Sequence, residues 1–403
     1  MRRSWTGILA AKKIRPYQTF YFSFSWMLAV SQGFFLAYLI SKGYSNTAIG
    51  WILAINTITG IAGQIGTGIL CDWLKKMKSI FIIWVVLLSA VTLLLYTVEL
   101  LPLFITAVIA VSFFQSALIG LIDSWIIETD EEVKSRFGEI RAFGSLGFGI
   151  SMIVTGGILS ITGYWLVPYL FFLFALLLLA VIRTLENPSS KQAAPEIKAK
   201  DLFRILQNRR FLWLNWIYIL FYMLLGMIGM YTVLLIEQGG GTAFHIGLFT
   251  ALVAFSEIPM FFLARTLVSR WTHMSILLAA ILFMLLRIAV LFFFQDVTVL
   301  ILSGVLQGIT MPLFMTASKQ LTDDVAAPGY RTTMQMVSIA AYLGIGGGIT
   351  SALAGWLSDT FTIQTALIGY TGLNIFAAAA AVLYLMKYYK PVRQKEMQEE
   401  LPL

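Results

Sequence analysis

The chain has 403 residues, of which 59% are hydrophobic and only 12% charged, and its mean hydropathy is +0.84. A water-soluble protein carries about 25% charged residues, so this composition excludes a soluble body of this size. The net charge of +8 does not indicate nucleic acid binding, because the basic residues follow the loops between apolar runs rather than one face. These runs are about 20 residues long, enough to cross a bilayer as a helix. The sequence therefore predicts a polytopic membrane protein.

Several classes of site have no support in the sequence. Cys71 is the single cysteine, so no intramolecular disulfide can form, and no CxxC or histidine cluster indicates a metal site. No GxxxxGK[ST] motif is present, so ATP is not expected as the direct energy source. The first apolar run is long, follows a basic stretch and lacks a small-x-small exit, so we do not interpret it as a cleaved signal. We expect neither a metal nor a cofactor.

The apolar runs predict an all-α integral membrane fold with twelve spans. Barrel strands would alternate polar and apolar residues, whereas these runs are continuous. The predicted spans are residues 17–40, 46–70, 79–98, 101–126, 140–161, 164–183, 212–236, 244–267, 275–294, 297–318, 330–356 and 363–386.

One long polar interruption, at residues 184–210, divides the spans into six and six. Two pseudo-symmetric helical bundles joined by a linker are expected to show this division. We therefore predict an amino-terminal bundle over residues 1–183, a linker over 184–210, a carboxy-terminal bundle over 211–390 and a tail over 391–403.

The distribution of basic residues predicts the orientation in the membrane. Of the 28 lysines and arginines, 25 fall in the segments on the side of the chain ends and the linker, and one, Lys42, falls on the other side. Cytoplasmic loops carry such an excess. We therefore expect a multi-pass protein of the cell (inner, cytoplasmic) membrane, with both termini and the linker in the cytoplasm.

Two acids and two arginines lie within or at the edge of the predicted spans. An ionised side chain at the bilayer centre costs about 2.5–3.5 kcal/mol, so each needs a partner or a function. Glu257 and Arg287 are predicted at similar depth on antiparallel neighbours, where they form either a structural ion pair or, as we favour, a pair that trades a proton. Asp123 and Arg141 lie nearer the inner ends of their spans, and position alone also allows them to reach the interface.

Uncharged polar residues also occur inside the spans. They either line a polar cavity or form interhelical hydrogen bonds. They are Gln32, Asn56, Gln64, Gln115, Asn215, Tyr218, Tyr222, Gln307, Gln335 and Asn374.

The loop from Gly68 to Lys78 combines a Gly-x-x-x-Asp spacing with basic residues. We expect Gly68 to allow close helix approach and Asp72 to cap or bridge a neighbouring helix end, with Lys76 in the basic part of this conformational loop. The loop, the twelve spans and the central linker together resemble the major facilitator superfamily, over the whole chain. The loop departs from the family pattern at Trp73, where a basic residue is usual, and at Lys75, where a glycine is usual. This resemblance implies a monomer of two six-helix bundles with a site between them near mid-membrane.

A narrower resemblance covers Ile122–Ser124 and Phe137–Phe148, which look like the lactose permease and phenylpropionate permease-like (oligosaccharide:proton symporter) group. In that group an acid and an arginine with this spacing bind the sugar, and an aromatic residue seven positions later stacks on its ring. The resemblance thus implies solute binding by Asp123, Arg141 and Phe148.

The second half resembles the same group around Glu257 and Arg287. Because Glu257 is predicted deepest in the membrane and span ten has no competing acid, we expect Glu257 to carry the proton, with Arg287 as its switching partner. In span ten the sequence has Gln307 and Thr310 where the group has a histidine and a glutamate ahead of a proline. The coupling route and galactoside specificity are therefore not expected to carry over. Gln307 and Asn215 complete the predicted solute-binding set.

The expected function is secondary active transport by alternating access, as proton-coupled symport of a small polar or amphipathic solute. Sugars or oligosaccharides are favoured, ahead of aromatic acids and nucleosides. The alternatives are a drug or lipid exporter of the same fold, a non-transporting sensor and a membrane-embedded enzyme. An enzyme is disfavoured because no interior histidine, cysteine or acid cluster forms a catalytic set. The expected partners are the solute, protons and the lipid bilayer, without nucleic acid.

Overall fold

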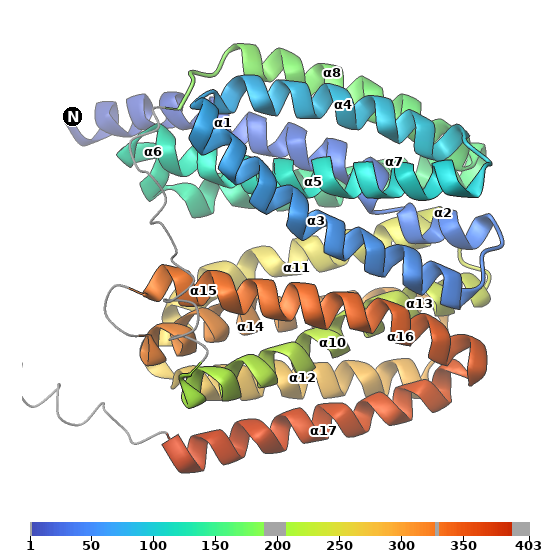
Figure 1. Ribbon diagram of the computed structural model, residues 1–403. Coiled ribbons are helices and arrows are strands. Elements are labelled where there is room, and N and C mark those ends of the chain that lie inside the picture. The colour runs from blue at the N-terminus through green and yellow to red at the C-terminus, as the bar shows by residue number, and fades with distance from the viewer. Residues whose placement is uncertain (1, 189–206, 327–329, 389–403) are drawn as a thin grey trace, which may run out of the picture.

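Continuous apolar sequence gives long helices throughout the computed structural model, which describes residues 2–188, 207–326 and 330–388. Within those residues, twelve helical stretches are long and apolar enough to cross a membrane, and no strand occurs. The twelve predicted spans are confirmed. The helices run side by side across the molecule and form an upper and a lower bundle in Figure 1.

The first six spans form the amino-terminal bundle. Its elements are α1 (Arg2–Gln32), α2 (Phe35–Ser41), α3 (Asn46–Leu74), α4 (Met77–Thr97), α5 (Leu101–Thr129), α6 (Glu131–Ser135), α7 (Phe137–Thr162), the 3-10 turn η1 (Tyr164–Leu166) and α8 (Val167–Arg183).

The last six spans form the carboxy-terminal bundle. Its elements are α10 (Arg209–Gln238), α11 (Ala243–Arg270), α12 (His273–Phe293), α13 (Val297–Leu302), α14 (Gly304–Val325), α15 (Arg331–Ala340), the π-helix η2 (Ala341–Gly346), α16 (Gly347–Thr360) and α17 (Ile363–Tyr388).

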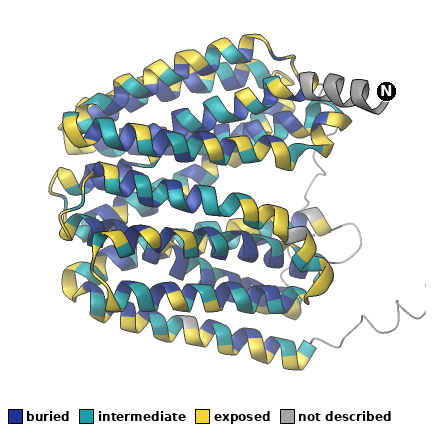
Figure 2. Ribbon diagram, turned by 180° about the vertical axis from the view of Figure 1, so that it is seen from behind, coloured by how far each residue is buried: buried dark blue, intermediate teal, exposed yellow. Residues whose placement is uncertain are grey.

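Burial follows what a bilayer requires. Buried residues face the inside of each bundle, and exposed residues cover the outer faces (Figure 2). Many exposed residues are large and apolar, such as Trp51, Phe262 and Met386. Such a surface is costly in water but suits contact with lipid chains.

Two helix pairs make most of the contact between the bundles, α3 with α16 and α7 with α11. A Cβ atom added at Gly355 would collide with the carbonyl oxygen of Asn46, and one added at Gly247 would collide with that of Met152. Only glycine allows such close backbone approach. The carboxylate of Asp359 also accepts hydrogen bonds from the backbone N–H groups of Asn46 (3.2 Å) and Thr47 (2.7 Å), at the start of α3.

These contacts lie at the end of the molecule opposite the chain termini, which we call the distal face. The terminal face is the end at which α1 and α10 begin and α17 ends (Figure 1). Toward the terminal face the contact between α3 and α16 ends: Gly68 is exposed, and a Cβ atom there would meet nothing within 4 Å. The close approach predicted at Gly68 is therefore wrong for this structure, because α3 meets α16 only over its distal part.

Both ends of the predicted linker are anchored. The backbone N–H of Lys78 donates to Oδ1 of Asn187 (3.3 Å), and the Lys78 ammonium donates to the carbonyl of Leu185 (2.5 Å). At the other end Asn208 caps α10 by accepting from the N–H groups of Arg210 and Phe211. The middle of the linker and the predicted tail at 391–403 lie outside the described residues.

Candidate functional site

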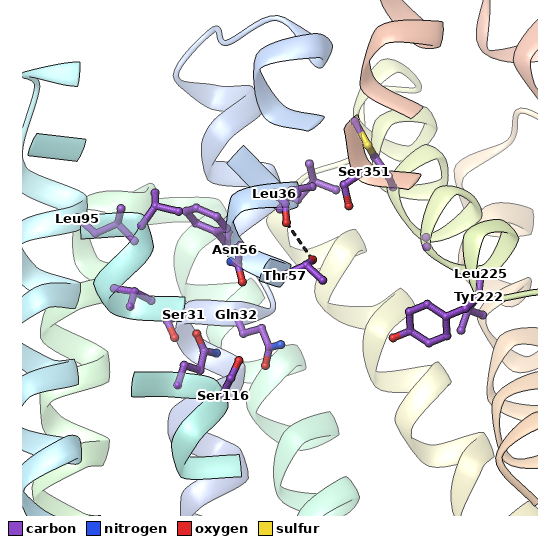
Figure 3. Close-up of a pocket in the computed structure, with 18 of the residues that line it drawn as sticks. Ser31, Gln32, Leu36, Asn56, Thr57, Leu95, Ser116, Tyr222, Leu225 and Ser351 are labelled. Atoms are coloured by element: carbon purple, nitrogen blue, oxygen red, sulfur yellow. Dashed lines mark hydrogen bonds between the residues drawn. The ribbon is translucent and has the colours of Figure 1, made fainter. Parts of the chain in front are cut away.

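A cavity of about 510 Å³ lies between the two bundles (Figure 3). This volume falls within the range of roughly 300–1,000 Å³ that is usual for small-molecule sites. Residues from α1 to α5 line it on one side, and residues from α10, α14 and α16 line it on the other. The polar lining residues are Ser31, Gln32, Asn56, Thr57, Tyr96, Gln115, Ser116, Tyr222, Gln307 and Ser351.

The cavity lining combines neutral hydrogen-bonding groups with apolar side chains. None of its lining residues carries a carboxylate, an ammonium or a guanidinium group. In Figure 3, Gln32 and Ser116 lie on one side and Tyr222 lies across from them. The Tyr222 ring packs on that of Tyr342 with centroids 5.2 Å apart, and the Thr57 hydroxyl donates to the carbonyl of Leu53 in its own helix (3.0 Å). The cavity therefore presents aromatic and hydroxyl surfaces together.

A second group of residues, the charged cluster, consists of Tyr21, Asp123, Arg141 and Glu257. The Tyr21 hydroxyl donates to Oδ1 of Asp123 (2.7 Å), which joins α1 to α5. Arg141 on α7 lies within electrostatic range of Asp123 in its own bundle and of Glu257 of α11 in the other, without a direct ion pair to either acid. A Cβ atom at Gly144 would collide with the Tyr21 ring, so glycine there makes room for the tyrosine. The structure thus places two of the predicted intramembrane acids within electrostatic range of one of the predicted arginines.

Arg287, the fourth predicted charge, lies elsewhere. Its guanidinium is fully buried, donates to the Thr232 hydroxyl (2.9 Å) and lies 5.6 Å from the centroid of the Phe249 ring. Phe249 precedes Glu257 by eight residues on α11, a separation of about 12 Å along a helix. The predicted contact between Glu257 and Arg287 is therefore wrong for this structure. The cause is depth: α12 spans His273–Phe293, which places Arg287 on the distal side of its midpoint.

The cavity and the charged cluster are separated in one bundle and adjacent in the other. On α5, Gln115 of the cavity precedes Asp123 by eight residues, again about 12 Å. On the other side, Gly308 packs so closely on Ser256 that a Cβ atom would collide with its hydroxyl. Gly308 follows Gln307 of the cavity, and Ser256 precedes Glu257 of the cluster. The α11–α14 contact therefore links the two regions.

Of the predicted solute-binding residues, Gln307 lines the cavity, and Asp123, Arg141, Phe148 and Asn215 do not. Phe148 is partly buried and packs against the apolar core. The Asn215 side chain is buried and donates to the carbonyl of Phe211 in its own helix (2.9 Å).

For several other polar residues of the cavity, the sequence had left two options open, lining a cavity or forming interhelical hydrogen bonds. It gave no indication that the small hydroxyl side chains line the cavity. Serine and threonine in a membrane helix often bond to their own backbone, so sequence alone gives no signal that separates the two uses. The missed residues are the hydroxyl-bearing Ser31, Thr57, Ser116 and Ser351, together with Tyr96.

The conformational loop has an unusual backbone at one residue. Lys75 has φ of 52° and caps α3, with its N–H donating to the carbonyl of Cys71 (2.8 Å). This left-handed conformation favours glycine, the residue that the family usually has here. Asp72 is exposed on the last turn of α3, and Lys76 precedes α4. Among the described residues no group of three or more His, Cys, Asp or Glu side chains is placed to hold a metal ion.

Comparison with known proteins agrees with this architecture. A family model described as the MFS_1-like family matches residues 14–368, most of the chain. The chain belongs to the major facilitator superfamily. It is therefore a transporter and not an enzyme, in agreement with the sequence prediction.

Sequence relatives of this facilitator include sugar permeases. It is 26% identical over 382 residues to a maltose permease of Geobacillus stearothermophilus, covering 94% of this chain and 95% of the relative. It is 22% identical to the sucrose permease of Escherichia coli, with 86% of each chain covered. An uncharacterized transporter of Bacillus subtilis, YwbF, is 25% identical with the same coverage.

Solved structures of other facilitators share the fold. The nucleoside transporter NupG superposes with a TM-score of 0.77 at 17% identity, covering 93% of this chain and 99% of that one. A D-xylose-proton symporter superposes with a TM-score of 0.65 at 15% identity, covering 95% and 98%. At these identities the likeness shows the fold alone.

Proposed function

We propose that this facilitator carries a neutral, polyhydroxylated solute, a sugar or oligosaccharide, together with a proton. The observation that carries the proposal is the cavity between the bundles, which offers hydroxyl and amide groups and no charged side chain. Sugars bind through many neutral hydrogen bonds and through apolar ring faces, and both kinds of surface are present. The naming of relatives as maltose and sucrose permeases supports the same class.

Aromatic acids fit this cavity less well than sugars do. A carboxylate that leaves water needs a cationic partner or several donors, and burying it unpaired is expensive. Arg141 belongs to the charged cluster and does not line the cavity, and Arg287 is fully buried beside the Phe249 ring and does not line it either. Nucleosides remain the second candidate, because they are neutral and hydroxylated and because Tyr222 offers an aromatic face.

The charged cluster is the proposed coupling site. Glu257 carries the proton, and Arg141, rather than Arg287, is its charged neighbour in this structure. A guanidinium stabilises a neighbouring carboxylate, so a change in their separation changes the proton affinity of the acid. Arg141 and Glu257 lie on different bundles, so any rocking of the bundles alters that separation. We assign Asp123 to the same site rather than to direct solute contact.

The test is transport by the purified protein in vesicles. Labelled maltose, sucrose, uridine and phenylpropionate are offered with and without an imposed proton gradient. The proposal expects uphill accumulation of a neutral hydroxylated solute that ends when an uncoupler removes the gradient. Uptake of phenylpropionate alone, or accumulation that does not respond to the uncoupler, would contradict it.

We also propose that the terminal face is cytoplasmic, in the cell membrane. The support is the basic bias of that side, where 25 of the 28 lysines and arginines lie. A membrane-impermeant thiol reagent outside intact cells should label Lys42→Cys, on the distal face, and should fail to label Gln192→Cys in the linker. Equal labelling of both, or labelling of the linker alone, would overturn this orientation.

A further inference from the structure

Three polar atoms in the walls of the cavity are buried without a hydrogen-bond partner. They are Nε2 of Gln115, the hydroxyl oxygen of Tyr96 and Oε1 of Gln307. Gln115 is 7% exposed and Tyr96 is 8% exposed. A buried polar atom without a partner destabilises the fold, and native proteins rarely keep one without a use. Three of the ten such atoms among the described residues belong to side chains that line this one cavity, so a molecule that enters it can complete their hydrogen bonds once these side chains rotate toward it.

These atoms lie on both bundles and differ in what they can bind. Tyr96 on α4 and Gln115 on α5 belong to the amino-terminal bundle, and Gln307 on α14 belongs to the carboxy-terminal bundle. The amide nitrogen of Gln115 donates, the amide oxygen of Gln307 accepts, and a tyrosine hydroxyl does both. The Tyr96 ring packs on the ring of Tyr38 with centroids 4.3 Å apart, which fixes its position.

The complement of this set is a molecule with several hydroxyl groups. Each hydroxyl both donates and accepts, so one polyol can accept from Gln115 and donate to Gln307. A carboxylate can only accept and would leave the oxygen of Gln307 without a donor. An amine would be charged, and the cavity has no carboxylate to pair with it.

We propose that Gln115 and Gln307 hold a single hydroxylated solute between the two bundles, with Tyr96 as a third contact. This inference rests on the proposed function, to which it adds the residues that set specificity. A site built to hydrogen-bond a hydroxyl group strongly rejects an analogue that lacks it, because its own buried groups are then left unpaired. We call this arrangement, one solute bound by Gln115 on one bundle and Gln307 on the other, the bridge. Because its two ends lie on different bundles, solute affinity depends on the relative position of the bundles.

The experiment measures binding of maltose, sucrose and uridine to the purified full-length protein by titration calorimetry, with the unfolding temperature recorded alongside. The variants are Gln115→Met and Gln307→Met, which keep the size of the side chain and remove the amide. The control is Gln64→Met, which removes an exposed amide on α3 that does not line the cavity. Gln115→Asn keeps an amide but shortens its reach, and serves if a methionine variant fails to fold.

The expected result is a loss of affinity of about ten- to hundredfold in each cavity variant, for whichever neutral probe the unaltered protein binds. The unfolding temperature of the free variants should stay unchanged or rise, because an unpaired buried amide has been removed. Gln64→Met should bind as the unaltered protein does.

The contradicting results are distinct. If the unaltered protein binds a sugar or uridine and the cavity variants bind it equally well, the bridge is wrong and the proposed function stands. If the free cavity variants unfold at much lower temperature, the amides are structural and the bridge is also wrong. If none of the neutral probes binds and an organic acid does, the proposed function fails and the bridge fails with it.

Discussion

The cavity and the charged cluster show how one molecule can separate two tasks that both require polar groups inside a membrane. The cavity uses amides and hydroxyls, several of them unpaired, and so leaves its hydrogen bonds to an incoming molecule. The cluster uses charged groups, with Tyr21 hydrogen-bonded to Asp123 and with Arg141 within electrostatic range of both Asp123 and Glu257. The difference teaches that a neutral cavity can receive a solute without direct contact with the charged groups proposed to carry the proton.

The two regions come close at one place, where Gly308 of α14, the neighbour of Gln307, packs against Ser256 of α11, the neighbour of Glu257. A solute that moves Gln307 is therefore one helix contact away from the proposed proton-carrying acid. This contact provides a physical route for coupling without placing a charged side chain in the cavity.

The largest expected effect comes from making the cavity charged. Gln307→Glu would place a carboxylate among neutral groups, and burying that charge without a partner is costly. We expect binding of the neutral solute to fall more than hundredfold at pH 7.5 and to recover in part at lower pH, where the new carboxyl is protonated. Calorimetric titration at both pH values measures this. Undiminished binding at pH 7.5 would show that the solute does not occupy the cavity.

Asp123→Asn, a change within the charged cluster, tests whether solute binding and proton coupling occupy separate regions. It removes the charge that interacts with Arg141 but keeps a group that accepts a hydrogen bond from Tyr21. We expect proton-driven accumulation to fall about tenfold while solute affinity changes less than threefold. Tyr21→Phe is the matched milder change. A loss of affinity larger than the loss of accumulation would return Asp123 to direct solute binding, as the sequence resemblance had implied.

Asp359→Ala should affect both regions alike, because it acts on the distal face that closes over them. It removes the carboxylate that accepts two hydrogen bonds from the backbone N–H groups at the start of α3, a change of about 1–2 kcal/mol for a helix cap. We expect the distal face to open more often, by about tenfold, as followed by the rate at which an external thiol reagent reaches Ser31→Cys in the cavity. An unchanged labelling rate would mean that the glycine contacts alone keep this face closed.

The smallest expected effect is at Lys75, which belongs to neither region. Its left-handed backbone is strained for a side chain with a Cβ atom. Lys75→Gly should raise the free energy of unfolding by about 1 kcal/mol or less and leave solute affinity and coupling unchanged. If chemical denaturation gives the variant a lower free energy of unfolding than the unaltered protein, the Lys75 side chain makes a contact that stabilises the fold by more than the backbone strain destabilises it.

The sequence was sufficient to predict the spans, and it was insufficient to place side chains within them. Runs of about 20 apolar residues identify a spanning helix almost without reference to its neighbours. Depth along the helix is less certain: Arg287 lies past the midpoint of α12, toward the distal face, beside Phe249 and not beside Glu257. Arg141 is within electrostatic range of Glu257 as well as Asp123, which the sequence did not indicate. Gln307 was predicted as a solute-binding residue because its position in span ten matches that of a functional residue in the lactose permease and phenylpropionate permease-like group.

The hydroxyl groups of the cavity could not have been found from the sequence alone. Whether Ser116 or Ser351 faces a cavity depends on how two bundles meet, and no local pattern in either helix records that meeting. The same limit applies to Gly68, which has the sequence spacing expected for close contact but lies in the part of α3 that does not contact α16.

The central claim is that solute binding and proton coupling occupy separate regions, and Glu257→Gln tests it most directly. Solute affinity and proton-driven uphill accumulation are measured on the same purified variant, with downhill exchange of labelled for unlabelled solute as the control for a working carrier. The account predicts unchanged affinity, surviving exchange and abolished uphill accumulation. Retained uphill accumulation would contradict the assignment of the proton to Glu257, and loss of affinity together with exchange would contradict the separation itself.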